Sequence, residues 1–226
     1  RVLFRSLAVQ DTTVGSLDGG AANAQIGYDS TSSFKGLMDE VAIWNTALTA
    51  DDVKNLYNYS FPRYSGSYVS PVASWSNIQA MQSVSWSSTL PFYKELTPTS
   101  EASSDYSAIS ANGEDLANGL VGLWHMDESS WNGTANEVRD SSGNGIHGQS
   151  FSGASTSSGR LNGAGSFAAH NGVEFTASDF DYEKTQAFTA CALVKGSTPT
   201  TSGVLFAKSK TSAPYLPGWA LETLSN

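Results

Sequence analysis

The sequence contains little charge, one cysteine and no long apolar run. Charged residues make up 15% of the 226 residues, and 12 basic against 21 acidic residues argue against the clustered cations that nucleic-acid binding requires. A single cysteine rules out a disulfide framework within the chain. No stretch approaches the roughly 18 uninterrupted apolar residues of a membrane span, so membrane insertion is not expected. The net charge of −9 favours neutral or cationic partners.

Short runs in which apolar and polar residues alternate are the main feature present. Such runs, separated by segments rich in Gly, Ser, Thr and Asn, are typical of strands that turn one face to a core. The run at 119–126 is apolar on both faces, which predicts a central strand covered on both sides. Cys191 is expected to be a small buried hydrophobic residue. In all, strands are predicted at 24–29, 37–44, 82–88, 119–126, 187–194, 203–208 and 218–224.

One helix is indicated, in ALTADDVKNLYNY. Thr49 and Asp52 have the spacing of a capping box, in which each side chain bonds the other residue's backbone amide. Val53, Leu56 and Tyr57 then fall on one helical stripe. The pattern predicts a helix of two turns near 50–58, packed on a sheet.

The composition changes between residues 61 and 116, which hold four of the seven prolines and many Ser, Tyr and Trp residues. Two interpretations stay open for this connector. It is either an ordered linker or a small module that packs its tryptophans on a neighbouring domain.

Two segments resemble bacterial laminin G-like domains, which are concanavalin A-like jelly rolls. FKGLMDEVAIWNTALTADDVKNLYNY (34–59) is similar to the closing segment of such a domain. GLVGLWHMDE (119–128) with RDSSGNGIHG (139–148) is similar to the opening segment. The resemblance implies an all-β, antiparallel jelly-roll β-sandwich that is truncated at both ends. Because the closing segment comes first, we expect the end of one domain at 7–60 and the start of a second at 117–226.

The reversed order has a structural consequence. In a jelly roll the first and last strands are expected to be neighbours, and here each of the two strands lacks its own partner. Unpaired strand edges are costly when buried. We therefore expect strand 37–44 to pair with strand 119–126, so that the two parts close one hybrid sandwich.

The chain opens with RVLFRS. These residues can be encoded by cgt gtg ctc ttc cga tct, the 3′ end of a widely used short-read sequencing adapter. We interpret residues 1–6 as translated adapter sequence, which implies a metagenomic reading frame broken at both ends. Other codons in the nucleotide record would contradict this interpretation.

No catalytic pattern is present. The three histidines lack a metal-hydrolase spacing, and no G-x-S-x-G elbow occurs. Asp39-Glu40 and Asp127-Glu128 are pairs of carboxylates, but adjacent residues of a strand point to opposite faces and cannot act on one sugar bond. The chain is therefore expected not to be an enzyme.

A metal site is indicated in the turn DSSGNG. Asp140 and Asn144 supply oxygen ligands of the kind that Ca²⁺ prefers, and similar domains often hold calcium in this kind of loop. Asp39 or Glu40, from the closing strand, is the expected partner. The same turn is equally a good Asx-turn that needs no ion, and this alternative stays open.

Trp131, in SSWNGT between two turns, is the candidate for ligand binding because it is expected to be partly exposed. The resemblance implies an extracellular or cell-surface module of a multi-module bacterial protein. Its expected partners are a glycan or a cell-surface or matrix ligand, and neighbouring modules of the same chain. Two alternatives stay open, an accessory module of a secreted glycoside hydrolase or sialidase and a spacer that binds nothing.

Overall fold

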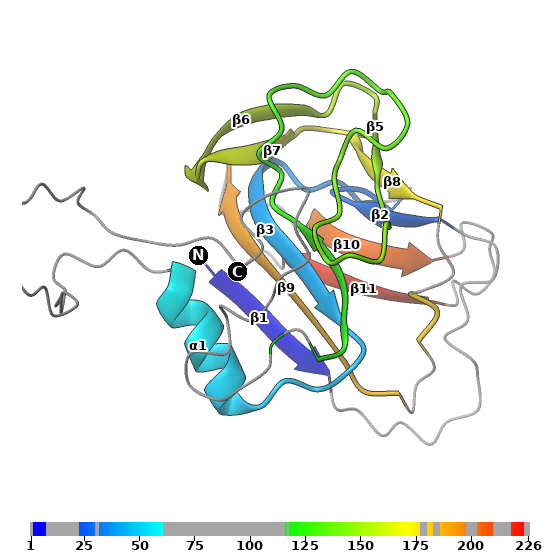
Figure 1. Cartoon of the computed structure of the whole chain (residues 1–226). Coiled ribbons are helices and arrows are strands. Elements are labelled where there is room, and N and C mark those ends of the chain that lie inside the picture. The colour runs from blue at the N-terminus through cyan, green and yellow to red at the C-terminus, as the bar shows by residue number, and fades with distance from the viewer. Residues whose placement is uncertain are drawn as a thin grey trace, which may run out of the picture.

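The structure is a computed structural model that describes 2–7, 23–29, 32–60, 116, 118–176, 180–182, 186–197, 203–209 and 218–223. Its strands form two layers, with the single helix of the described residues beside one of them (Figure 1). The strands are β1 (Val2–Leu7), β2 (Ala24–Ile26), β3 (Gly36–Trp44), β4 (Leu120–Trp124), β5 (Gln149–Phe151), β6 (Ser155–Leu161), β7 (Gly163–Phe167), β8 (Gly172–Phe175), β9 (Phe188–Gly196), β10 (Gly203–Ser209) and β11 (Gly218–Thr223).

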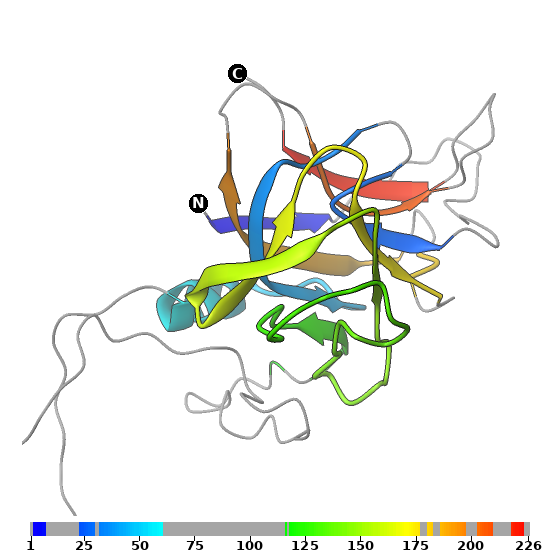
Figure 2. The same cartoon turned by 90° about the horizontal axis from the view of Figure 1, so that it is seen from above.

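The strands form a six-stranded and a five-stranded sheet, and every pairing is antiparallel. The six-stranded sheet has the order β1-β9-β3-β7-β6, with β4 also paired to β3. The five-stranded sheet has the order β11-β10-β2-β8-β5. Figure 2 shows the two layers from above. The predicted fold class, an antiparallel concanavalin A-like β-sandwich, is confirmed.

Six of the seven predicted strands are present, and the seventh, at 82–88, lies outside the described residues. Nearly all of the connector at 61–116 lies outside them as well, so both interpretations of it stay open. Alternation did not indicate β5 to β8, because these strands are short or, like β6 (STSSGRL), mostly polar. The domain division, including the adapter interpretation of residues 1–6, stays a prediction.

The expected pairing between the two parts of the chain is confirmed. β3 and β4 are antiparallel neighbours, with Val41 opposite Trp124 and Ala42 opposite Leu123. One core contains residues from both parts, among them Met38 and Trp124. β4 is not central, however, because among the described strands it pairs with β3 alone. Its second edge is occupied by a loop, as the site geometry below explains.

Aromatic rings fill the space between the sheets. Trp124 is fully buried against Phe175, with ring centroids 4.6 Å apart, and its indole N–H donates to the carbonyl of Ile146 at 2.9 Å. Trp219 stacks on Phe206 with ring centroids 5.2 Å apart. This agrees with the alternation of its strand, which predicts that Trp219 faces the core. The rings exclude water while the tryptophan N–H groups keep a partner, which makes their burial favourable.

The helix α1 (Ala50–Ser60) has three turns, not the two predicted. The capping box is confirmed: Thr49 N donates to Asp52 Oδ2 at 2.8 Å, and Asp52 N donates to Thr49 Oγ1 at 3.2 Å. Leu56 packs with Cys191 on the outer face of the six-stranded sheet, and the predicted burial of Cys191 is confirmed. Tyr57 is 39% exposed, so the packed stripe is narrower than predicted.

No helix within the described part of the chain is both long and apolar enough to cross a membrane.

Replacing Trp124 by Ala should lower the free energy of unfolding by roughly 3–5 kcal/mol, because it leaves a cavity in the core shared by both parts of the chain. Tyr57→Ala, on the exposed side of α1, is the matched control and should change it by less than about 0.5 kcal/mol. Urea denaturation of the 226-residue chain measures both. Equal effects of the two substitutions would contradict a shared core.

Candidate functional site

A β-bulge in β3 shapes the site. Between the pairs Asp39–Leu193 and Ala42–Cys191, β3 has one residue more than β9, and Glu40 adopts a left-handed φ of 51°. The bulge breaks the alternation of faces, so that Met38 and Val41 both belong to the core. Asp39 and Glu40 consequently lie together on the outer side. The expectation that these neighbouring carboxylates point to opposite faces is therefore wrong, because it assumed a regular strand.

Glu40 joins the two parts of the chain. Its Oε1 lies 2.6 Å from Nδ1 of His125, the residue that follows β4, and both side chains are buried. A buried carboxylate needs such a polar partner, because losing water without one is costly. The contact holds the bulge of β3 against the end of β4.

Asp39 is buried in an asymmetric environment. Its Oδ2 accepts hydrogen bonds from the amides of Arg160 and Leu161 at 3.1 and 3.0 Å, whereas its Oδ1 is buried without a hydrogen-bond partner. Burial, and then the charge of Glu40, raise the pKa of Asp39 from 3.8 to about 8, against the opposing effect of the two amides. At neutral pH the carboxyl group is mostly protonated.

The β6–β7 hairpin brings the two amides to Asp39. At Gly159 a Cβ atom would lie 1.6 Å from the carbonyl oxygen of Gly163, so the close approach of the two strands requires glycine. At Gly163 a Cβ atom would lie 2.4 Å from the Cα of Asp127, just beyond β4. The hairpin therefore packs tightly against the end of β4.

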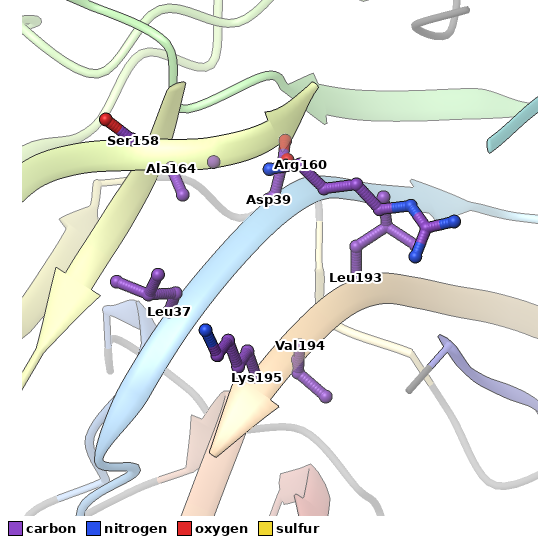
Figure 3. A pocket seen from close by; sticks show the side chains of 9 residues that line it. Leu37, Asp39, Ser158, Arg160, Ala164, Leu193, Val194 and Lys195 are labelled. Carbon is purple, nitrogen blue, oxygen red and sulfur yellow. Dashed lines mark hydrogen bonds between the residues drawn. The ribbon is translucent and has the colours of Figure 1, made fainter. Parts of the chain in front are cut away.

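A pocket of about 310 Å³ opens beside Asp39 on the outer face of the six-stranded sheet. Leu37 and Lys195 alternate along their strands with Met38 and Val194 of the core, which places them on this outer face. Figure 3 shows the side chain of Asp39 from β3 beside Arg160 of β6, with Lys195 on β9. The lining consists of Leu37, Asp39, Ser158, Gly159, Arg160, Ala164, Leu193, Val194 and Lys195.

The predicted calcium loop forms hydrogen bonds within the protein. Asp140 Oδ1 accepts from the amides of Leu123 and Ser142, and its Oδ2 accepts from Ser142 Oγ and the amide of Ile146, all at 2.8–3.0 Å. The side-chain amide of Asn144 donates to the carbonyl of Val121 at 2.9 Å. The loop thus binds the free edge of β4 as a further strand would.

This donor set does not by itself form a calcium cage, which needs six to eight oxygens directed at the ion. Both carboxylate oxygens of Asp140 already face protein donors. Asp39 and Glu40 are engaged with the β6 amides and with His125 respectively. Within the described ranges, no group of three His, Cys, Asp or Glu side chains is placed to hold a metal ion. Calcium binding stays a prediction.

Trp131 is 7% exposed, so its expected exposure is wrong. Its ring packs edge-on against Phe167 with centroids 6.2 Å apart, and its indole N–H donates to Glu128 Oε2 at 2.8 Å. Glu128 Oε1 accepts from the amide of Arg139 at 2.6 Å. Burial raises the pKa of Glu128, although these hydrogen bonds oppose the shift. In this structure the ring closes one edge of the core and is not presented to solvent.

Sequence reasoning named Asp39 but missed the pocket and its two basic residues. Arg160 and Lys195 lie in segments that contain no recognisable motif. The sequence around Arg160 offers only a weak indication of a binding role, because it shows a single basic residue between Gly159 and Leu161. Only the folding of β6 over β3 brings it to Asp39.

Comparison with known families found a match for the N-terminal part of the chain. Residues 7–54 match the family model of the concanavalin A-like lectin/glucanases superfamily. This confirms the resemblance noted for the segment that begins at Phe34. The matched range includes β3, and therefore contains Asp39 and Glu40. No match was found among the curated proteins or among the solved structures.

Asp39→Asn should remove a pH dependence of stability. The Asp39 carboxyl group keeps its proton up to about pH 8 in the folded chain but releases it near pH 3.8 in the unfolded chain. Its contribution to the free energy of unfolding is therefore complete below pH 3.8 and is lost as the pH rises to about 8. The loss should be on the order of a few kcal/mol. Urea denaturation at several pH values should show a fall for the wild type and a flatter profile for Asp39→Asn.

Asp51→Asn, at the exposed start of α1, is the control and should follow the wild-type profile. Parallel profiles for the wild type and Asp39→Asn would contradict the assignment of the proton to Asp39.

Asp140→Ala should lower the free energy of unfolding by roughly 2–4 kcal/mol, because three amide donors lose their acceptor. Asp140→Asn keeps one acceptor oxygen and should lose less. A loss of equal size in buffers with CaCl₂ and with EDTA would show that Asp140 stabilises the loop through these hydrogen bonds alone. A loss confined to the calcium buffer would instead support a metal ligand.

Proposed function

We propose that the chain is a non-catalytic carbohydrate-binding β-sandwich module and that its binding site is the pocket beside Asp39. The observation that carries the proposal is the pocket itself, in which the carboxyl group of Asp39 and the cationic side chains of Arg160 and Lys195 lie among aliphatic residues. Ligand pockets combine an apolar lining with a few such fixed polar groups.

The residues around the pocket favour binding over hydrolysis. Glycosidases place two carboxyl groups across one sugar bond, and here Asp39 is the only carboxyl group among the residues that line the pocket. Glu40 is hydrogen-bonded to His125 and does not line the pocket. The description of the matched superfamily names both lectins and glucanases. The single carboxyl group in the pocket supports binding, as in a lectin, over hydrolysis, as in a glucanase.

The wider setting is part of the same proposal. An extracellular or cell-surface location is proposed, with neighbouring modules of the parent protein and a glycan or matrix ligand as partners. An accessory module of a glycoside hydrolase or sialidase would use the same pocket, next to a catalytic domain elsewhere in that protein. A spacer would bind nothing. Calcium at Asp140 and Asn144 is a separate proposal, supported only by the oxygen-rich loop.

A glycan array probed with the 226-residue chain tests carbohydrate binding. Ser158→Trp should reduce binding by at least roughly tenfold, because Ser158 is exposed and lines the pocket, and an indole there would fill it. Ser155→Trp is the matched control on the same strand, exposed but not among the lining residues.

Binding that Ser158→Trp abolishes and Ser155→Trp preserves would support the proposal. Binding that neither substitution affects would place the site elsewhere. No binding to any glycan would overturn the proposal in favour of a spacer.

A further inference from the structure

We propose that the pocket beside Asp39 binds an anionic sugar residue, with Arg160 and Lys195 as its charge partners. This inference rests on the proposed carbohydrate-binding function and adds the class of ligand. It runs against the overall charge of the chain, which on its own favours neutral or cationic partners.

The charge of the pocket differs from that of the chain. The chain carries 21 acidic and 12 basic residues, yet the residues that line the pocket include two basic side chains and one acidic one. Arg160 reaches the pocket from β6 and Lys195 from β9, on two strands that are not sheet neighbours. With two cationic side chains and one carboxyl group, the lining carries a net positive charge whether Asp39 is ionised or not.

The size and floor of the pocket fit a small polar ligand. Its volume of about 310 Å³ lies at the small end of the range of roughly 300–1,000 Å³ for ligand pockets. Leu37, Ala164 and Leu193 provide an aliphatic floor without an aromatic ring. With no ring for a sugar to stack on, charged and hydrogen-bonding groups must supply more of the selectivity. Arg160 and Lys195 are exposed, so their attraction should weaken in salt.

The experiment measures the affinity of the 226-residue chain by titration calorimetry for four probes. Digalacturonic acid and its dimethyl ester differ in the carboxylate charges and in two added methyl groups, and a sulfated disaccharide and its unsulfated form differ only in the sulfate. Both anionic probes should bind more tightly than their neutral counterparts, by roughly tenfold at low salt. A preference in only one pair would identify that anion as the ligand group.

Arg160→Ala and Lys195→Ala should each reduce the affinity for the anionic probes by roughly three- to tenfold and leave the neutral probes little changed. Arg139→Ala removes the same charge as Arg160→Ala from an exposed residue that does not line the pocket, and should leave all four affinities unchanged. Equal losses for Arg139→Ala and Arg160→Ala would reduce the effect to net charge and overturn the site.

The two proposals fail differently. If neutral and anionic probes bind equally and Ser158→Trp removes both, the anionic preference is wrong while carbohydrate binding stands. If neither type of probe binds and the glycan array is also empty, the proposed function fails as well.

Discussion

The interior of β3 must find hydrogen-bonding neighbours along both edges, and the rest of the molecule is arranged around that requirement. One edge pairs with β9 over most of its length, while the other pairs first with β7 and then with β4. The bulge at Glu40 lies where the neighbour changes, and the contact between Glu40 and His125 holds the new neighbour in place. A strand left without one of these partners would expose buried amides and carbonyls, which is costly.

The same bulge divides the outer face of the six-stranded sheet. Beyond it, Ala42 and Trp44 lie under α1 and form a second apolar cluster with Leu56. Before it, Asp39 faces a pocket that the β6–β7 hairpin and β9 enclose. A structural irregularity in one strand therefore creates the position in which a buried carboxyl group lines the pocket of the proposed function.

Carboxylates also organise the loop that ends the sheet. Asp140 binds three amides and one hydroxyl group, and so covers the edge of β4 without a further strand. Glu137 accepts from the amides of Asn132 and Gly133 and from Ser150. Its burial is outweighed by these hydrogen bonds, which lower its pKa. In a chain with few basic residues, backbone amides are the principal partners of these acids.

Local pattern alone determined the strands with strong alternation, the capping box at Thr49 and the burial of Cys191, because each depends on neighbours within a few residues. Resemblance added the fold class and the pairing of β3 with β4. The pocket could not be predicted, since Arg160 lies 121 residues from Asp39 and reaches it only when β6 folds over β3. Asp140 and Trp131 show the same limit: an acidic turn or a tryptophan between turns has the same sequence whether it faces solvent or the protein. Only the tertiary structure decided which, because burial and hydrogen-bond partners come from segments distant in the chain.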